Sequence, residues 1–494
     1  MKKLVPISDV EGRVEHFIFG QITHPNVYID RFEAADLLTA NRFDLAFKLA
    51  FLKYREVNAE LSQTIYWHDI RSQTLGRFEE YGNPEKNNFD VYVSDFRKTL
   101  ADLQENSFDE TRTLIPLSSN GRILNGAHRL ACAIFSEETV VGVDTGLPDV
   151  SPDYRYFLER NVPPTIMDIA ADTFCDFGKN LYLAFLWPSG RGNYEVTRGA
   201  FENIVYEKML TLTPNGGLNL LIELYKHMDW VGSADQGYTG AQKKLVECFT
   251  DFKPFSVILF QCDSLEKVRE IKQKVRDVNA IGFSSIHITD TREEVSRVAS
   301  LIFNECGVHF LNYGKPYTYR STIERLEALR GLSASALENL VVDGSMTLAL
   351  YGVREARDVD YLSVCDTSSL AEGLSFDFEE HDSQLVYHGV SKEELIYNPE
   401  FYFKYSGVKF VAFDQSFKFK KRRGEGKDIV DCEVMQSSIE GFSAAMVAAR
   451  VKQYFFYWRV VLKNRSIVIG LALLRSTGTY ETARRIIRRL RSLW

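Results

Sequence analysis

Two aspartates separated by one residue give this sequence its clearest chemical signal. Asp358 and Asp360 lie in the short segment DVDYL, which we expect to form a strand. Because residues i and i+2 of a strand point to the same face, the two carboxylates should lie side by side. Paired carboxylates of this kind are suited to holding a divalent cation such as Mg²⁺.

A Gly-Ser pair lies shortly before these aspartates. Gly344 and Ser345 follow the apolar run LVVD and stand where a helix is expected to begin. A helix N-terminus presents free backbone N–H groups to an anion, so Gly344 and Ser345 are candidate phosphate contacts. The order Gly-Ser, helix, Asp-Val-Asp therefore predicts a site for a metal and a nucleotide. The alternative is a tight strand-to-helix turn followed by two solvated acids.

A second candidate anion site lies in the first third of the chain. Asn125, Gly126, Ala127, His128 and Arg129 join a short strand to the apolar helix LACAIF. A glycine followed by His-Arg in the first turn of a helix would place backbone N–H groups, an imidazole and a guanidinium together, as in an anion cradle. The alternative is a hairpin and helix in which His128 and Arg129 only cap and pair.

The composition is that of an ordinary globular protein. With 494 residues, 45% of them apolar and 26% charged, the chain should hold two to four domains. A net charge of −8 gives no overall attraction to nucleic acid. The seven cysteines are dispersed without a CxxC pair, which argues for reduced cytosolic thiols rather than a disulfide framework or a zinc site.

Neither a signal peptide nor a membrane span is expected. The N-terminal segment MKKLVPISDVEGRV has no apolar core. The longest apolar run, IVIGLALL, is far shorter than the roughly 20 residues that a membrane span needs. We therefore expect a cytoplasmic protein.

These candidate sites require several folded blocks to position them. We expect a multidomain α/β (α+β) chain with divisions at 1–150, 151–330, 331–445 and 446–494, the last a helical basic tail. In the middle block, strand-like and helical segments alternate, which predicts a parallel sheet. His287 lies near the end of one such strand, where open α/β sheets bind ligands. The alternative for His287 is a satisfied core histidine.

The strand, turn, strand, Asn-Gly-x-His-Arg and apolar helix resemble the ParB/sulfiredoxin-like domain. In that superfamily the Gly-x-His-Arg loop binds nucleotide phosphates, and some members are small-molecule kinases that phosphorylate free serine. The resemblance implies nucleotide contacts for Asn125, Gly126, His128 and Arg129. Many members have Asp where this chain has Asn125, so any role of that Asp as a base or metal partner is not carried over.

A kinase of this type also needs a carboxylate that accepts the proton of the attacking hydroxyl. Glu80, in the segment EEYGN, and Glu56 are the two candidates in the first block. Each is otherwise an ordinary surface acid.

The apolar-Gly-Ser, helix and Asp-x-Asp succession resembles the nucleotidyltransferase fold of the polymerase-beta type. That resemblance implies phosphate contacts at Gly344 and Ser345 and Mg²⁺ ligands at Asp358 and Asp360. Many members carry a third carboxylate on a neighbouring strand, for which Asp382 and Asp414 are the nominees here.

A basic segment further along the chain, FKFKKRRGEGKDIVD, resembles the Lys/Arg and Lys-Asp-x-x-Asp region of relatives of that fold. Lys420, Arg423 and Lys427 would share one helical face if a helix ran through Gly424 and Gly426. They would then bind substrate phosphates, and the alternative is a solvated face. Each glycine inside a helix costs about 1 kcal/mol, which counts against a continuous helix.

The C-terminal tail TARRIIRRLRSLW (482–494) is basic and amphipathic. Such a segment suits an anionic membrane surface, so we expect peripheral contact with the inner face of a membrane. A partner groove, the protein's own core and nucleic acid are the alternatives, the last being poorly supported on an acidic chain.

Taken together, these patterns predict a Mg²⁺-dependent kinase or nucleotidyltransferase. It would move a phosphoryl or nucleotidyl group from ATP or CTP to a small hydroxylated acceptor such as a sugar, polyol or glycan precursor, as in polysaccharide biosynthesis. One alternative is a glycosyltransferase that uses Asp-x-Asp to hold a sugar nucleotide, although the Gly-Ser helix is not part of that pattern. The other is a ParB-like regulator that binds DNA and uses nucleotide as a switch, although no helix-turn-helix pattern follows residue 135.

Overall fold

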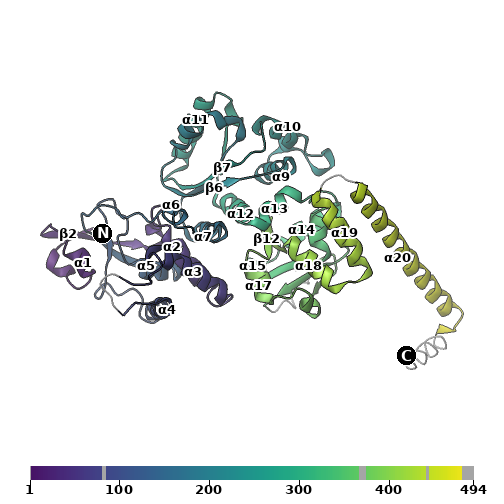
Figure 1. The fold of residues 1–494 in the computed structure, drawn as a ribbon, viewed down its shortest axis with the longest axis horizontal. Coiled ribbons are helices and arrows are strands. Elements are labelled where there is room, and N and C mark those ends of the chain that lie inside the picture. Colours follow the sequence, from purple (N-terminus) through teal and green to yellow (C-terminus); the bar gives the residue numbers. More distant parts are fainter. Residues whose placement is uncertain (1, 81–84, 366–373, 441–443, 481–494) are drawn as a thin grey trace. The chain divides into compact units, whose positions relative to one another are not determined.

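The structure is a computed structural model that describes residues 2–80, 85–365, 374–440 and 444–480. The chain is mixed α/β, and the described residues form three small sheets (Figure 1). By its internal contacts it divides into two units. The first comprises Met1–Asp382 with Val390–Phe413, and the second Ser383–Gly389 with Asp414–Trp494.

The first sheet is formed by the N-terminal strands. Its order is β1-β2-β4-β3, with β3 parallel to β4 and the other neighbours antiparallel. The strands are β1 (Lys3–Pro6), β2 (Asn26–Glu33), β3 (Ile115–Leu117) and β4 (Thr139–Asp144). The helices of this region are α1 (His16–Phe19), α2 (Asp44–Tyr54), α3 (Ala59–Gln73), α4 (Phe89–Asn106) and α5 (Ala127–Phe135).

Helix α2 is the centre of the N-terminal core. All but one of its residues are buried, because α3, α5 and α7 (Pro164–Phe177) pack around it. Apolar residues recur at helical spacing in the segment 42–57, and the helix occupies its middle, Asp44–Tyr54. Burial on every side also explains why two charged residues of α2, Asp44 and Lys48, lie inside the protein.

The second sheet has the order β6-β7-β5-β8, and all its neighbouring strands are antiparallel. The strands are β5 (Leu181–Leu186), β6 (Ile204–Leu210), β7 (Phe255–Gln261) and β8 (Ile286–Ile288). The helices here are α6 (Tyr154–Leu158), α8 (Tyr194–Arg198), α9 (Pro214–Tyr225), α10 (Thr239–Cys248), α11 (Leu265–Asn279), α12 (Arg292–Ile302), α13 (Glu305–Tyr313) and α14 (Arg320–Leu329).

The prediction of a parallel sheet in this middle block was wrong. Strands β7 and β8, joined by α11, do run in the same direction, but β5 lies between them and pairs antiparallel with both. This is a split β-α-β arrangement. Local periodicity identifies the strands but cannot reveal a third strand inserted between them from earlier in the chain.

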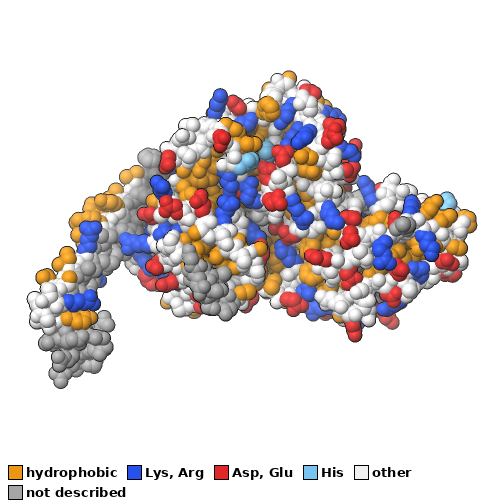
Figure 2. Space-filling view, turned by 180° about the vertical axis from the view of Figure 1, so that it is seen from behind, with side chains coloured by type: hydrophobic (Ala, Val, Ile, Leu, Met, Phe, Trp, Pro, Cys, Tyr) orange, Lys and Arg blue, Asp and Glu red, His pale blue; other side chains and the backbone are white. Residues whose placement is uncertain are grey.

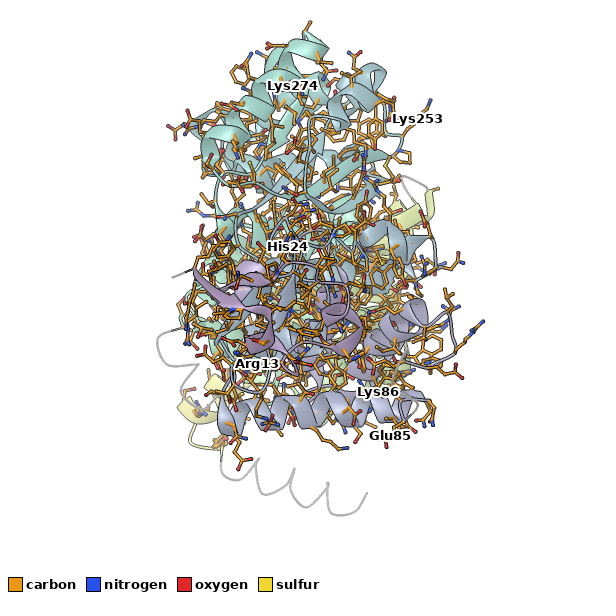
Figure 3. All side chains as sticks on the ribbon, turned by 90° about the vertical axis from the view of Figure 1, so that its left-hand side faces the viewer. Arg13, His24, Glu85, Lys86, Lys253 and Lys274 are labelled. Atoms are coloured by element: carbon orange, nitrogen blue, oxygen red, sulfur yellow. The ribbon has the colours of Figure 1, made fainter. Side chains whose placement is uncertain are left out.

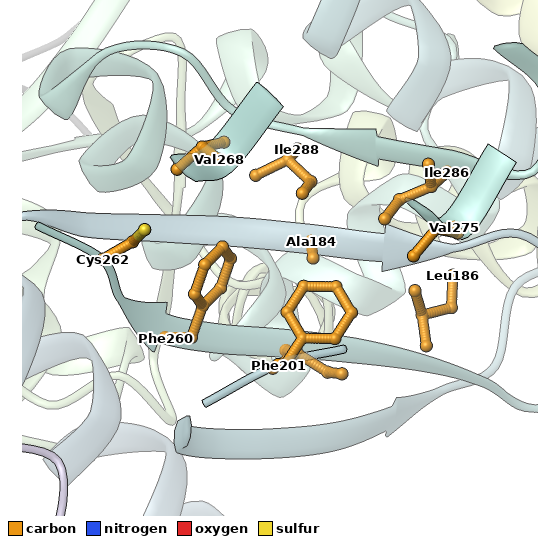
Figure 4. Close-up of a cluster of buried hydrophobic side chains, with 10 residues drawn as sticks. Ala184, Leu186, Phe201, Phe260, Cys262, Val268, Val275, Ile286 and Ile288 are labelled. Atoms are coloured by element: carbon orange, nitrogen blue, oxygen red, sulfur yellow. The ribbon is translucent and has the colours of Figure 1, made fainter. Parts of the chain in front are cut away.

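The core of this sheet lies between its strands and α11. Phe260 and Ile288 from the sheet and Val268 and Val275 from α11 are fully buried together (Figure 4). The two valines are seven residues apart and so share one face of the helix. Burial of this apolar face fixes α11, and with it the loop that leads into β8.

The third sheet carries the predicted metal site. Its order is β11-β10-β9-β13-β12, with β9 antiparallel to β10 and parallel to β13. The strands are β9 (Leu340–Asp343), β10 (Val359–Ser363), β11 (Phe378–Glu380), β12 (Tyr402–Tyr405) and β13 (Val408–Val411). The helices are α15 (Ala334–Asn339), α16 (Ser345–Leu350) and α17 (Lys392–Tyr397).

The C-terminal helices are α18 (Phe413–Arg423), α19 (Gly426–Glu440) and α20 (Ala444–Ser476). The helix does not continue through Gly424 and Gly426, in line with the two glycines counting against it: α18 ends at Arg423, and Gly424 has φ +67°. Glycine reaches this left-handed conformation without steric cost, so it ends the helix. Helix α20 packs against α19, and the tail 482–494 lies outside the described residues. Among the helices that the structure describes, none has the length and apolar character needed to cross a membrane.

Candidate functional site

Three carboxylates lie in a row across neighbouring strands of the third sheet. Asp360 on β10 pairs directly with Asp343 on β9 and stands in register with Glu379 on β11. Residues paired in this way project from the same face of a sheet. Asp358 lies in the bend just before β10, and its charge also acts on Asp360. The strand register thus aligns three acidic side chains, of which the sequence predicted Asp360.

Gly344 lets the backbone approach this row closely. It has φ +64°, and a Cβ atom at this position would stand 2.5 Å from Oδ2 of Asp360. Any side chain would therefore both strain the backbone and displace the carboxylate. Gly344, a predicted phosphate contact, thus lies directly against the Asp360 carboxylate.

Ser345 connects the start of α16 to the other predicted ligand. Its hydroxyl is within hydrogen-bond distance of Asp358 Oδ1 at 2.9 Å and of the Asp358 carbonyl oxygen at 3.2 Å. All six residues of α16 are buried, so the helix is firmly anchored. Ser345 and Asp358 lie 13 residues apart in the sequence, and this contact joins the Gly-Ser turn to the Asp-Val-Asp strand.

The electrostatics of the row oppose full ionisation of Asp360. Burial raises the pKa of Asp360, and the negative charges of Asp358, Asp343 and Glu379 raise it further, while His381 acts in the opposite direction. His381 Nδ1 lies 3.2 Å from Asp343 Oδ2. A divalent cation would relieve the repulsion between these acids.

The donor set fits a magnesium ion that takes some of its ligands from the protein and the others from water and a substrate. In the described part of the chain, no group of three or more His, Cys, Asp or Glu side chains is arranged to hold a metal. Mg²⁺ is commonly bound through one or two carboxylates together with water and substrate phosphates. Asp358 and Asp360 would supply the two carboxylates.

The residues that the sequence reasoning missed are Asp343, Glu379 and His381. Asp343 directly precedes Gly344, and the segment FDFEEH has the alternation of a short strand, so both signals were present. The nominees for the third carboxylate lie elsewhere. Asp382 forms an ion pair with Lys392 at 2.6 Å, and Asp414 is an exposed residue of the second unit.

The basic segment is largely committed to internal ion pairs. Lys420 is buried, and its Nζ lies 3.2 Å from Asp428 Oδ1 and 3.0 Å from Asp431 Oδ2. Arg423 also pairs with Asp428, at 2.7 Å. Lys427, on the far side of the Gly424 turn, is half-exposed and pairs with Glu425. The Lys-Asp-x-x-Asp pattern thus joins α18 to α19.

The Asn-Gly-Ala-His-Arg loop forms the start of α5, with Gly126 in the left-handed conformation at its N-cap. His128 Nε2 lies 2.7 Å from the hydroxyl of Tyr66 on α3. Burial, together with the charges of Lys48 and Lys86, lowers the pKa of His128 well below its usual value. The imidazole is therefore neutral at pH 7 and fixed by its tyrosine partner.

Arg129 turns to a different set of partners. Its guanidinium bonds to Thr113 and Glu15, and it folds back over Gly126, where a Cβ atom would be 3.0 Å from Nη2. It lines a cavity of about 420 Å³ together with Arg13 and Arg112. Adjacent positions on a helix do not face each other, so His128 and Arg129 leave the loop in different directions. Asn125 precedes the loop and is half-buried.

Of the two candidate bases, Glu80 lies near the histidine. Its carboxylate pairs with Lys86 at 3.0 Å, and Lys86 lies close enough to His128 to influence its pKa. Burial raises the pKa of Tyr92 to about 12, with the charge of Glu80 contributing. Glu56 is mostly exposed and pairs with the neighbouring Arg55. Glu80 is therefore the better placed of the two. Figure 3 labels Lys86 on this part of the molecule.

A buried ionic cluster contacts the segment that leads into the Asn-Gly-Ala-His-Arg loop. Lys48 Nζ lies 2.7 Å from Asp69 and 3.3 Å from Asp44, and Asp44 also forms two hydrogen bonds of 2.8 Å with Arg42. Arg42 in turn donates to the carbonyl oxygen of Ile123, two residues before the loop. The cluster therefore ties α2 and α3 to the segment that precedes Asn125.

His287 lines a cavity of about 960 Å³ in the middle block. Its Nε2 lies 3.2 Å from Glu294 Oε1 and its Nδ1 lies 2.9 Å from the Tyr225 hydroxyl. Burial opposes ionisation of Glu294, but its hydrogen bonds to His287 and Asp290 outweigh burial and lower its pKa. Both ring nitrogens of His287 thus have protein partners, as expected of a satisfied histidine.

Comparison of the chain with protein-family models, with curated proteins and with solved structures finds no match. The geometry of the chain's own residues is therefore the basis for any statement about its activity. Within that geometry, the acidic row on the third sheet combines the largest number of features suited to chemistry.

Proposed function

We propose that this protein is a Mg²⁺-dependent transferase that moves a phosphoryl or nucleotidyl group from a nucleoside triphosphate to a small hydroxylated acceptor. The observation that carries the proposal is the row of carboxylates Asp343, Asp360 and Glu379, with Asp358 beside it and the Gly344-Ser345 turn against it. A sugar, polyol or glycan precursor in the cytoplasm is the acceptor class we favour.

In this proposal Asp358 and Asp360 hold the metal through their carboxylates. Mg²⁺ held there would supply charge neutralisation at the phosphates during transfer. The backbone of Gly344 and the hydroxyl of Ser345 contact the triphosphate, for which Ser345 would exchange its bond to Asp358. We propose Asp343 as the general base, because it lies directly opposite Asp360. His381 contacts its carboxylate.

The arrangement around His128 supports a second nucleotide site. Lys86 pairs with Glu80, burial and the charge of Lys86 lower the pKa of His128, and a glycine in the left-handed conformation opens α5. In the proposed role, Glu80 accepts the proton of the acceptor hydroxyl once Lys86 has moved to a phosphate. Asn125 and Gly126 complete the phosphate contacts, whereas Arg129 faces the separate cavity that it lines with Arg13 and Arg112.

The direct test is calorimetric titration of the whole chain with ATP and CTP in the presence of Mg²⁺. We expect Asp358→Ala and Asp360→Ala to abolish metal-dependent binding at one site and to leave the other unchanged. Glu380→Gln is a matched control, because Glu380 follows Glu379 and projects from the opposite face of the sheet. Full metal-dependent binding and turnover in both aspartate variants would refute the assignment.

A further inference from the structure

Helix α20 leaves an apolar stripe exposed, interrupted once by the exposed Arg465. Seven large apolar side chains on it are between 43% and 69% exposed: Val447, Val451, Tyr454, Trp458, Leu462, Ile469 and Leu473. They are separated by three, four or seven residues, which places them within an arc of about 100° on an α-helix. Phe455, 56% exposed, lies at the edge of the same arc. Single exposed apolar residues are common, but a stripe of them marks an interaction surface.

The charge of α20 has one sign only. The sequence from Ala444 to Ser476 contains no Asp or Glu and six basic residues: Arg450, Lys452, Arg459, Lys463, Arg465 and Arg475. Hydrophobic and basic side chains lie beside each other on this long helix in Figure 2. A surface of this kind is complementary to a partner that is both apolar and negatively charged.

Three exposed basic residues follow one edge of the stripe, while the exposed Arg465 lies within it and Arg475 beyond its other edge. Lys452, Arg459 and Lys463 directly follow Val451, Trp458 and Leu462, so each lies about 100° around the helix from an apolar neighbour. Lys452 forms an exposed ion pair with Glu433 of α19 at 3.1 Å. No carboxylate of the residues described here lies within ion-pair distance of Arg459 or Lys463.

We propose that α20 docks the protein on an anionic lipid surface. The apolar stripe would lie at the level of the acyl chains, and the flanking Arg and Lys side chains would reach the lipid phosphates. Tyr454, Phe455 and Trp458 are the residue types that favour the boundary between headgroups and hydrocarbon. The helix lies in the plane of the surface in this proposal, in keeping with the absence of a spanning helix among the residues described.

Two other occupants fit the helix less well. A second copy of α20 packed stripe to stripe would bring basic residues together without acidic partners from either helix. Nucleic acid would satisfy the basic residues, but its phosphate backbone would leave the apolar stripe in water. A lipid surface satisfies both components at once. The docking does not depend on the nucleotide chemistry proposed for the acidic row.

The test is flotation of the full-length protein with vesicles. We expect it to bind vesicles of phosphatidylcholine with about 30% phosphatidylglycerol, and to bind pure phosphatidylcholine far less. Raising NaCl from about 0.1 M to about 0.5 M should weaken binding, because salt screens the basic residues. Binding that does not depend on lipid charge would overturn the proposal.

Two variants locate the binding on α20. Arg459→Glu/Lys463→Glu should lower partitioning at least about tenfold, since each basic residue near an anionic surface contributes roughly a fivefold gain. Phe455→Ala/Trp458→Ala should lower it by a similar factor through lost apolar contact. Both pairs are exposed, so neither variant should unfold the chain, and far-UV circular dichroism checks this.

Lys253→Glu/Lys274→Glu is the matched control, with the same change of charge at two exposed lysines of the middle block, both labelled in Figure 3. It should float as the parent does. The proposal fails if this control loses binding as strongly as the α20 variants, or if the α20 variants bind unchanged. It also fails if light scattering shows a dimer that Phe455→Ala/Trp458→Ala converts to a monomer while vesicle binding is absent. If the protein binds single-stranded RNA in a salt-sensitive way and does not bind vesicles, the proposal is also wrong, and the partner of α20 is nucleic acid.

Discussion

Asp343 and Asp360 are directly opposite each other on the antiparallel strands β9 and β10. Both project from the same face of the sheet. Burial raises the pKa of Asp360, and the negative charge of Asp343 raises it further. Holding like charges together in a protein interior is costly unless something compensates them. A site that binds a divalent cation has a reason to bear this cost, and the first predictions follow from it.

Asp360→Asn should stabilise the protein in the absence of metal. The pKa of Asp360 is raised in the folded state, so its ionisation opposes folding at pH values above the ordinary Asp range. Removing the charge should increase the free energy of unfolding at pH 7.5 by about 1 kcal/mol, the size of a typical stabilising substitution. Urea unfolding in EDTA measures it. Glu380→Gln, on the opposite face, should have no such effect.

Mg²⁺ binding at the acidic row should weaken on acidification earlier than at an ordinary aspartate pair. The metal binds the ionised carboxylate, and a raised pKa means that Asp360 takes up a proton at a higher pH. Calorimetric titration with Mg²⁺ and nucleotide between pH 5 and 8 should give an affinity that falls steadily toward the acid end. An affinity that is constant over this range would contradict the role of Asp360.

Lys420→Met should destabilise the protein, whereas Lys427→Ala should not. Lys420 is buried between Asp428 and Asp431, and removing its charge deprives both buried carboxylates of this ion-pair partner. Breaking a buried pair typically costs about 3–5 kcal/mol. Lys427 is half-exposed, and its pair with Glu425 is worth well under about 1 kcal/mol. Thermal unfolding of the two variants compares them. Equal stability would mean that the Lys420 cluster is not structural.

His128 should make the N-terminal block less stable in acid. Its pKa is lowered in the folded protein from 6.5, so below that pH the unfolded chain binds a proton that the folded chain does not. The free energy of unfolding should fall by up to about 1.4 kcal/mol per pH unit. Urea unfolding between pH 7.5 and 5.5, compared with His128→Asn, isolates this part. A variant with an equal loss on acidification would contradict the prediction.

Ser345→Ala should separate binding from folding. Its buried hydroxyl contacts the partly exposed Asp358 at 2.9 Å, and the loss of this one hydrogen bond should cost only about 1 kcal/mol of stability. Nucleotide affinity should fall more than this when Mg²⁺ is present, because the proposed phosphate contact is lost as well. Calorimetry with and without Mg²⁺ measures the difference. Equal, small effects under both conditions would leave Ser345 with a structural role only.

The sequence by itself determined the local chemistry of this protein. The Gly-Ser turn, the strand that carries Asp360, the helix that begins after Gly126 and the buried helix α2 all follow from turn residues and periodicity, which act over a few residues. The mixed α/β character and the absence of a long apolar run could be read in the same way.

Only the tertiary structure decided what lies next to what. Strand pairing placed Asp343 and Glu379 beside Asp360 and inserted β5 between β7 and β8. The packing of the helices gave His128 and Arg129 different partners. It also buried Lys420 in ion pairs where a binding face was expected. These outcomes depend on pairings between residues far apart in the chain. Such pairings are decided by packing and charge compensation in the folded chain, and local patterns in a single sequence do not reveal them.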